Sequence, residues 1–299
     1  MNNNSLPRPF IKWAGGKTQL ADELVNRLPN EFINYHEPFL GGGAFFFNLY
    51  RDGRIGHARI SDLNSELIDV YCAIRNNRDA VIKELSKYPH DEEFYYQLRS
   101  KNPLELSLPD RAARMIYMNK TGYNGLYRVN KSGGFNVPFG KYKNPKYLDK
   151  ENLQAVSSAL QKVDIHNASF ETVLDYANEG DLVYFDPPYV PVSQTSNFTS
   201  YQADGFSIKD QRKLRDVCVE LTKRNIYIIL SNSDTETVRD LFSPYSFEIS
   251  EVLANRNINC NGNRRGKMTE LIITNYPTEK TMQLQLLENR SFFTVSVPS

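Results

Sequence analysis

A short apolar run that ends at two prolines sets the strongest limit on how this chain can fold. Residues 182–185 (Leu-Val-Tyr-Phe) favour a buried strand, and Asp186-Pro187-Pro188-Tyr189 follows directly. Proline lacks a backbone N–H, so the strand has to end there. In an open α/β sheet, ligands bind outside the carboxyl ends of the strands. The tetrapeptide is therefore a candidate site, although ordinary turns use the same residues.

The remaining sequence alternates strand and helix patterns. We expect strands near residues 34–40, 57–60, 163–167, 182–185 and 226–230. Helices are expected from residue 44, after residue 62 through 82, and at 92–99, 109–120, 157–160 and 208–224. This alternation predicts an α/β fold with a parallel, doubly wound sheet. The last two apolar segments, 247–253 and 271–276, predict a hairpin at the sheet edge.

Composition excludes several classes of protein. The 299 residues include 40% apolar side chains, enough to bury a core and to form one or two domains. Neither a zinc site nor a disulfide framework is expected, because Cys72, Cys218 and Cys260 lie far apart and the four histidines lack metal-ligand spacing. No signal pattern opens the chain, and its longest aliphatic run, 226–230, is too short to cross a bilayer. We therefore expect a soluble, intracellular protein that binds neither metal nor membrane.

Positive charge gathers in two segments, although the formal net charge is only +1. Residues 110–150 hold nine lysines and arginines against two acids, and residues 255–267 hold four basic residues and no acid. Such segments can face a polyanion or can simply be solvated surface. Within the first of them, residues 121–145 are rich in Gly, Asn, Pro and Tyr, which indicates a long ordered loop or hairpin. Long structured loops commonly carry function.

Two glycine-rich segments differ in what they predict. Residues 14–18 (Ala-Gly-Gly-Lys-Thr) do not form a Walker loop, because the first glycine of that pattern would fall on Ile11. Residues 37–44 (Glu-Pro-Phe-Leu-Gly-Gly-Gly-Ala) lie between a predicted strand and helix, where small residues let a ligand approach the backbone. They lack the spacing of a dinucleotide site. Asp62 ends the next predicted strand, where a carboxylate can accept hydrogen bonds from ribose hydroxyls.

Together these motifs resemble those of Dam-type DNA adenine methyltransferases, the alpha group of the D12 class. The resemblance covers residues 10–276 and rests on segments in a fixed order: 10–17 (FIKWAGGK), 37–43 (EPFLGGG), 61–64 (SDLN), 122–128 (GYNGLYR), 135–140 (FNVPFG) and 186–189 (DPPY). It implies transfer of methyl from S-adenosyl-L-methionine to the exocyclic amino group of adenine in double-stranded DNA, most often within GATC. It also implies a Rossmann-like catalytic domain (1–71 and 161–299) and an inserted, mainly helical target-recognition domain (72–160), with a DNA-contacting hairpin at about 121–145.

The resemblance also implies a set of cofactor contacts. These are Trp13, Lys17, Phe39, Gly41, Gly43, Asp62 and Asp186. In this interpretation Asp62 binds the ribose, and residues 39–43 lie beneath the methionine part. The single tryptophan is equally a candidate for ordinary core packing. A lysine at position 17 can reach the carboxylate of the methionine part, although a surface lysine looks the same in sequence.

The implied chemistry needs neither a metal nor a covalent enzyme intermediate. The adenine amino group is a poor nucleophile, because its lone pair is delocalised into the ring. Asp186 and the carbonyl of Pro187 can accept its two hydrogens and hold the nitrogen in line with the methyl group. Pro188 helps to fix that geometry, and Tyr189 offers a face on which the base stacks. Because the nitrogen is paired in a duplex, the target adenine has to be flipped out.

The resemblance assigns the DNA contacts mainly to the basic middle of the chain. The residues are Lys12, Tyr123, Asn124, Leu126, Arg128, Pro138, Lys141, Tyr142, Arg264 and Arg265. Tyr123 and Asn124 would enter the opened base stack, and Leu126 would touch a thymine methyl. At position 141 a lysine stands where many relatives have arginine, so recognition of one base pair is less rigid. The two late arginines are expected to clamp the phosphate backbone, unless their loop is simply solvated.

Two other functions fit parts of the pattern. One is an amino-methyltransferase that acts on RNA or protein, although such relatives commonly start the tetrapeptide with Asn. The other is a DNA-binding regulator with a vestigial methyltransferase site. A DNA methyltransferase would be cytoplasmic and associated with the nucleoid, with a cognate restriction endonuclease as a genetic partner. The segment 231–233 (Ser-Asn-Ser) is expected at the rim of the site, where it would support the flipped base.

Overall fold

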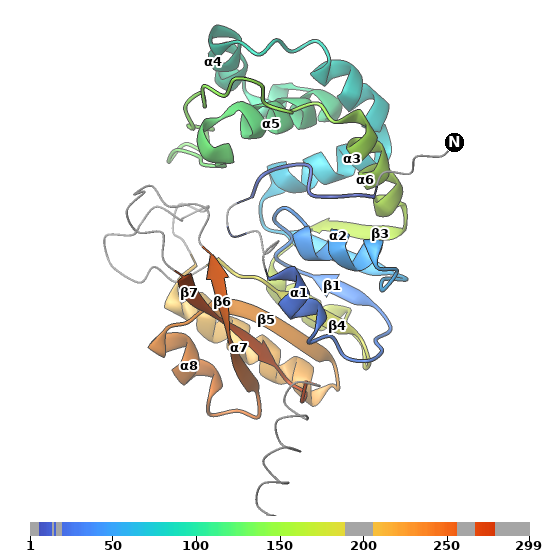
Figure 1. The fold of residues 1–299 in the computed structure, drawn as a ribbon, viewed down its shortest axis with the longest axis vertical. Helices are drawn as coiled ribbons and strands as arrows, with labels where there is room; N and C mark the ends of the chain where they lie inside the picture. Colours follow the sequence, from blue (N-terminus) through green and yellow to red (C-terminus); the bar gives the residue numbers. More distant parts are fainter. Residues whose placement is uncertain (1–5, 14, 16–19, 189–205, 256–266, 279–299) are drawn as a thin grey trace, which may run out of the picture.

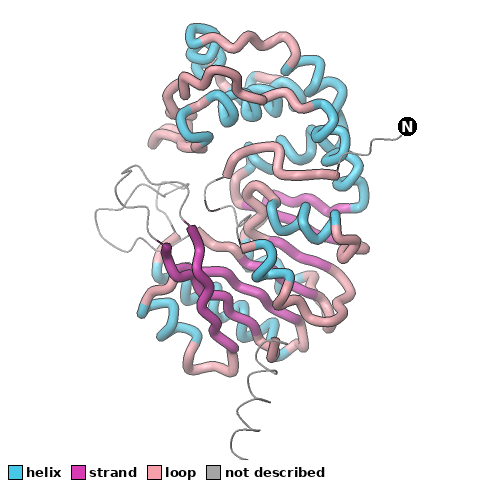
Figure 2. Tube along the Cα trace, in the orientation of Figure 1, coloured by secondary structure: helices cyan, strands magenta, loops and turns pink. Residues whose placement is uncertain are grey.

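A seven-stranded sheet forms the centre of the molecule (Figures 1 and 2). The computed structural model describes residues 6–13, 15, 20–188, 206–255 and 267–278. The strand order is β3-β2-β1-β4-β5-β7-β6. The strands are β1 (Tyr35–Glu37), β2 (Ala58–Asp62), β3 (Val163–Asn167), β4 (Leu182–Phe185), β5 (Tyr227–Ser233), β6 (Glu248–Asn255) and β7 (Lys267–Thr274). The first five are parallel, and β7 pairs antiparallel with both β5 and β6. The predicted doubly wound sheet with an edge hairpin is therefore confirmed.

Several strands end at different residues from those predicted, and β1 and β5 differ for clear physical reasons. β1 stops at Glu37 and not at residue 40, because Pro38 has no N–H to continue the ladder. β5 continues beyond Leu230 to Ser233, although this stretch is polar. Its backbone groups find partners in β7, where Ser231 pairs with Ile272 and Asn232 pairs with Leu271. Antiparallel pairing thus extends a strand that the apolar pattern alone would end early.

Helices cover both faces of the sheet. The face that includes Tyr35 and Ile60 packs against α1 (Ala21–Val25), α2 (Ala44–Arg51) and α3 (Ser65–Leu85) in one apolar cluster. The opposite face, with Val183 and Phe185, packs against η4 (Phe170–Asp175), α7 (Ile208–Lys223) and α8 (Glu236–Phe242) in a second cluster. Alternate residues of each strand face opposite sides, so one sheet separates two cores.

A group of helices follows β2 and lies above the sheet in Figure 1. It contains α3, α4 (Glu92–Ser100), η1 (Pro103–Glu105), α5 (Leu108–Thr121), η2 (Tyr123–Gly125), α6 (Lys150–Ala159) and η3 (Leu160–Lys162). Helix α3 runs across the predicted boundary between residues 71 and 72 and kinks at Asn77. The first apolar cluster joins Ile60 of the sheet to Tyr95 and Met115 of these helices without a break. The sheet and the helical group therefore share one core.

Two further observations concern predicted absences. Among the residues that the structure describes, no helix is both long and apolar enough to cross a membrane. Within the same residues, His, Cys, Asp and Glu side chains form no group of three that would hold a metal ion.

Candidate functional site

The candidate site lies where the strand order of the sheet reverses. β1 pairs with β2 on one side and with β4 on the other, so the connections after β1 and β4 leave in opposite directions. Such a switch point opens a crevice at the carboxyl ends of parallel strands. The glycine turn 41–43 follows β1, Asp62 ends β2, and Asp186 follows β4. Three motifs from distant parts of the sequence therefore meet at one edge of the sheet.

In the glycine turn, the backbone packs closely against neighbouring side chains. Gly41 has φ +50° and Gly43 has φ +65°, in the left-handed region that favours glycine. A Cβ atom on Gly41 would lie 2.6 Å from Cδ1 of Trp13, closer than atoms can pack. The Tyr71 hydroxyl donates to the Gly41 carbonyl at 3.2 Å and holds the turn from the α3 side. These contacts explain why both positions require glycine.

Asp62 is tied to the glycine turn through its carboxylate. Its Oδ2 accepts a hydrogen bond from the Gly41 N–H at 3.0 Å, and its Oδ1 accepts one from the Asn64 N–H at 2.9 Å. Burial raises the pKa of Asp62, while these backbone donors lower it. The backbone of Leu63 is a third donor to this carboxylate. An ionised carboxylate has about four acceptor positions, so Asp62 can still accept a ribose hydroxyl. The side chain therefore fits the predicted ribose contact.

Trp13 packs against the core and also lies beside the glycine turn of the candidate site. Its ring stacks on Tyr127 with centroids 5.3 Å apart and lies against the glycine turn. The Tyr127 hydroxyl donates to Glu66 at 2.8 Å, and Glu66 pairs with the buried Arg114 at 3.0 Å. Trp13 is only partly buried, so core packing and a cofactor contact are compatible. The predicted cofactor residue Lys17 lies outside the described residues.

An aromatic cluster borders the glycine turn on the α7 side. Phe39 stacks on Phe170 at 5.2 Å and contacts Phe185 and Phe206 edge-on at 6.4 Å and 5.7 Å. Only Phe39 was predicted as a site residue. Phe170 lies in η4, a 3-10 helix without a clear periodic pattern, so its sequence does not point to the cluster.

Asp186 is held by a neighbouring strand. Its Oδ1 accepts a hydrogen bond from the Ser231 hydroxyl at 3.0 Å. Pro187 is buried and Pro188 is half-buried, so the chain leaves β4 in a fixed direction. Tyr189, the last residue of the tetrapeptide, lies outside the described residues. The segment 231–233 thus contacts the carboxylate itself through its first residue.

Glu37 is a buried carboxyl beside the site to which the sequence assigns no role. It is 2% exposed, and its Oε2 accepts a hydrogen bond from Tyr35 at 2.7 Å. Burial raises the pKa of Glu37 to about 8, the bond from Tyr35 lowers it, and the charge of Asp186 raises it further. Glu37 therefore holds a proton at neutral pH. It lies near the Asp186 carboxylate, because both residues stand at the carboxyl ends of the neighbouring strands β1 and β4.

Most of the predicted DNA contacts lie in or against the segment 121–145. Antiparallel bridges join Gly122 to Phe139 and Val129 to Phe135, so the segment is an ordered loop closed like a hairpin. Tyr123 is 48% exposed, and Asn124 has φ +54°. The exposed positions also include Pro138 and Lys141, the latter with φ +52°. Leu126 is partly buried against the first core, and Tyr142 is half-buried.

Lys12 joins this loop from the N-terminal segment. The Lys12 N–H donates to the Asn119 side-chain oxygen at 2.7 Å. The Asn119 side-chain nitrogen donates in turn to the carbonyls of Lys12 and Gly125 at 2.8 Å and 2.9 Å. The Lys12 ammonium lies 4.8 Å from the centroid of the Tyr142 ring. Lys120 was not predicted as a site residue. Burial and the nearby Lys12 charge lower the pKa of Lys120 to about 8. Two cations therefore share this surface.

Arg128 is braced within the loop. Its Nε donates to Oδ1 of Asn136 at 2.6 Å, and its terminal nitrogen donates to the Asn136 carbonyl at 3.0 Å. These bonds fix the plane of the guanidinium and leave further donors for a ligand. The other two arginines predicted to contact DNA, Arg264 and Arg265, lie outside the described residues.

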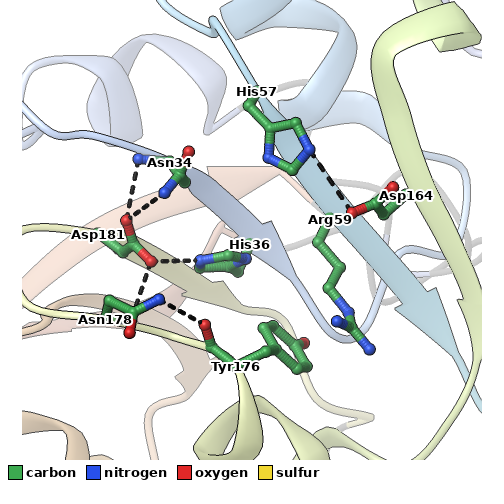
Figure 3. A pocket seen from close by; sticks show the side chains of 8 residues that line it. All are labelled: Asn34, His36, His57, Arg59, Asp164, Tyr176, Asn178 and Asp181. Atoms are coloured by element: carbon green, nitrogen blue, oxygen red, sulfur yellow. Dashed lines mark hydrogen bonds and ion pairs between the residues drawn. The ribbon is translucent and has the colours of Figure 1, made fainter.

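A separate polar cavity of 280 Å³ lies away from the carboxyl ends of the parallel strands (Figure 3). His36 points to the opposite face of the sheet from Glu37, and its Nε2 lies 2.8 Å from Asp181. Asp181 also accepts bonds from Asn34 and Asn178, as the dashed lines in Figure 3 show. Arg59 stacks on the Tyr176 ring at 3.6 Å. The cavity walls fasten the starts of β1 and β4, and the cavity is not part of the crevice at their carboxyl ends.

Comparison with known proteins gives an independent assignment. The family model "D12 class N6 adenine-specific DNA methyltransferase" matches residues 13–258. The chain is 41% identical to "Type II methyltransferase M1.LlaDCHI" of Lactococcus lactis over 90% of this chain and 95% of the relative. It is 42% identical to "Type II methyltransferase M.MjaIII" of Methanocaldococcus jannaschii over 90% and 99%.

More distant relatives carry a different name. The "DNA adenine methylase" of Escherichia coli K12 is 34% identical over 89% of this chain and 94% of the relative. Among solved structures, a putative tRNA (m1A22) methyltransferase of Streptococcus pneumoniae covers 93% of this chain and 88% of its own, with a TM-score of 0.36 and 9% identity. A superposition this loose supports no assignment. By the family match and the close relatives, the chain belongs to the D12 class of N6 adenine-specific DNA methyltransferases.

Proposed function

We propose that this methyltransferase moves the methyl group of S-adenosyl-L-methionine to the exocyclic amino group of a flipped adenine in duplex DNA, within GATC. The family supports the reaction class. The observation that carries the proposal further is the position of Asp186. Its carboxylate lies at the switch point of the sheet, beside the glycine turn and Asp62. That edge offers a hydrogen-bond acceptor for the substrate next to a cradle for the cofactor.

The cofactor cradle is assigned from contacts. S-adenosyl-L-methionine supplies an electrophilic methyl group on a cationic sulfur. Asp62 would accept its ribose hydroxyls, and the turn at Gly41 and Gly43 would lie beneath its methionine part. The Trp13 ring lies against Gly41, and Phe39, two residues before that glycine, stacks on Phe170. Lys17 would pair with the methionine carboxylate. The left-handed backbone of this turn at the end of β1 and the remaining acceptor capacity of Asp62 support this fit.

Asp186 and the Pro187 carbonyl would act on the substrate amino group. Each accepts one N–H hydrogen, which holds the nitrogen in line with the methyl group and strengthens its lone pair. Pro187 and Pro188 restrict the backbone on which that carbonyl sits. Tyr189 would stack on the flipped base. The chemistry then consists of one displacement, with positioning as the main contribution of the protein.

The segment 121–145 would supply the DNA contacts, as the exposed part of a recognition domain at 72–160. Tyr123 and Asn124 project from the turn of η2 and would fill the opened base stack. Lys12 and Lys141 would face phosphate or base, and Arg264 and Arg265 would clamp the backbone. The exposure of this basic loop, and its attachment to Lys12 through Asn119, support the assignment.

The proposal is tested by transfer of labelled methyl from S-adenosyl-L-methionine to two duplexes of equal composition, one with GATC and one with the site scrambled. We expect label on adenine of the GATC duplex alone. Equal labelling of both duplexes would contradict the site. If neither is labelled, transfer to genomic DNA would show a different recognition sequence. Transfer to RNA or protein alone would favour the amino-methyltransferase alternative. DNA binding without cofactor binding or transfer would favour the regulator with a vestigial site.

Arg128→Ala should weaken discrimination between sites. Loss of a guanidinium that contacts a base should cost ~1–3 kcal/mol on the cognate duplex and little on a scrambled one. Equilibrium binding to both duplexes measures this difference. Lys131→Ala is the control, because Lys131 is an exposed cation of the same loop and its loss should weaken both duplexes alike. Equal losses for Arg128→Ala on both duplexes would place Arg128 on the phosphate backbone.

A further inference from the structure

Three polar groups form a chain between β4 and β5: the buried Tyr184 and Ser231, and the half-buried Asp186. These strands are parallel, with Phe185 opposite Leu230, so Asp186 and Ser231 come next on each strand. The Ser231 Oγ lies 3.0 Å from Oδ1 of Asp186 and 3.1 Å from the Tyr184 hydroxyl. Tyr184 and Asp186 are two residues apart and face the same side of the sheet, with the serine between them. Ser231 is 0% exposed and Tyr184 is 1% exposed.

The number of hydroxyl hydrogens decides which group donates in each of these hydrogen bonds. A serine hydroxyl has one hydrogen to donate, and an ionised carboxylate can only accept. If Ser231 donates to Asp186, then the Tyr184 hydroxyl has to be the donor in its contact with Ser231. The other acceptor near the serine, the Phe185 carbonyl, lies farther away at 3.5 Å. Donation therefore runs from Tyr184 to Ser231 and on to Asp186.

Serine is an unusual residue at this position in β5. It directly follows Ile228, Ile229 and Leu230, which are all buried. A buried hydroxyl destabilises a fold unless it is hydrogen-bonded, so this serine needs its partners. A carboxylate held at one oxygen by a buried donor cannot rotate freely about its last bond. The bond from Ser231 therefore limits the orientation of the whole Asp186 carboxylate relative to β5.

We propose that Ser231 is a positioning residue that orients the Asp186 carboxylate for methyl transfer, and that Tyr184 supports it by donating to Ser231. The inference rests on the proposed role of Asp186. Orientation matters because near-attack geometry is sensitive to displacements of about 1 Å. The chain acts through Asp186 and need not touch substrate or cofactor.

The first test compares variants in single-turnover methyl transfer. Ser231→Ala should slow the step about 10- to 100-fold, as expected for one lost hydrogen bond to an ionised group, with KM for DNA and cofactor within about twofold. Ser231→Thr keeps the hydroxyl and should recover most of the rate. Tyr184→Phe leaves the bond to Asp186 in place and should cost less, about 2- to 10-fold. Ser250→Ala, which removes a β6 hydroxyl that donates to Ile272, should keep the wild-type rate.

The second test is the pH dependence. A donor to the carboxylate favours its ionised form, so Ser231→Ala should move the acid limb of the rate profile up by about one pH unit. Glu37 and Tyr35 of β1 also act on this neighbourhood, and Tyr184 faces it from β4. The pKa of Glu37 is about 8, and burial raises the pKa of Tyr35 well above its usual value, so both affect the alkaline side. Burial also raises the pKa of Asp62, which titrates on the acid side in every variant. The shift of the acid limb between wild type and Ser231→Ala, and not its position, therefore reports on Asp186.

Three kinetic results would overturn the inference. These are an unchanged rate in Ser231→Ala, a slower rate with an unchanged acid limb, and no recovery in a folded Ser231→Thr. Melting temperatures of Ser231→Ala and Ser250→Ala show whether a general loss of stability explains the effect. Carbon-13 NMR titration of the carboxyl signal that disappears in Asp186→Asn gives a readout without activity. If Asp186→Asn keeps wild-type activity, the proposed function fails. If that titration is unmoved in Ser231→Ala, only the positioning role fails.

Discussion

Asp186→Ala is expected to abolish methyl transfer almost completely and to leave DNA affinity within about twofold of wild type. The substitution removes an acceptor that would hold the substrate amino group only when the base is in the site. Loss of such a group costs on the order of 10³-fold in rate. Single-turnover transfer and equilibrium DNA binding, measured on one preparation, separate the two effects.

Two further variants sharpen this experiment. Asp186→Asn keeps the size of the side chain and one acceptor oxygen but replaces the other oxygen by a donor, so its rate should lie between those of the alanine variant and wild type. Asp216→Asn changes an exposed carboxylate on α7 that pairs with Arg215, and it should behave as wild type. A fall in DNA affinity that matches the fall in rate would contradict the assigned role.

Glu37→Gln is expected to stabilise the fold increasingly as pH rises. Burial raises the pKa of Glu37 from 4.5 to about 8. Between these values the folded chain keeps a proton that the unfolded chain has lost, so stability falls by ~1.4 kcal/mol per pH unit. The stability that the proton provides is complete below pH 4.5 and is lost as pH rises through 8. Glutamine stays neutral and removes this slope, a gain of up to ~3 kcal/mol at pH 7.

Urea unfolding of both proteins at several values between pH 5.5 and pH 8.5 measures the effect. The difference in the free energy of unfolding should widen with pH and then level off above about 8. Glu31→Gln is the control, because Glu31 is an exposed residue of the loop before β1. Parallel profiles for wild type and Glu37→Gln would show that Glu37 is already ionised in the folded protein at pH 5.5.

The sequence predicts the larger elements well because their apolar periodicity is strong. The patterns near 57–60, 163–167 and 182–185 correspond to β2, β3 and β4, and the pattern at 208–224 corresponds to α7. Short helices are the elements that it misses. Helix α8 has only seven residues, and its start depends on the Thr235 side chain accepting from the Val238 N–H at 3.3 Å. Such a cap is a local event that hydrophobic periodicity does not register.

Some residues of the candidate site can be predicted from the sequence and others cannot. The glycine turn, Asp62 and Asp186 stand next to strand ends, so their meeting at one edge follows from the parallel sheet. Ser231 and Glu37 depend on which face of a strand is buried and on which strand lies beside it. The amino-acid sequence alone does not show that β1 is next to β4, or that β5 continues to Ser233. The hydroxyl chain and the buried proton therefore become visible only in three dimensions.

The core shared by the sheet and the helical group restricts how new specificities can be engineered. Cuts at 71/72 and 160/161 would divide α3 and separate Tyr71 from Tyr95 and Leu160, although all three belong to one apolar cluster. A chimera joined there with a relative's segment would have to rebuild that packing. The loop 122–149, between α5 and α6, lies mostly at the surface and is anchored by Asn119 at the Gly125 carbonyl and by Tyr95 at the Val137 carbonyl. Exchange of this loop alone, with its anchors retained, is the graft that leaves the fold intact.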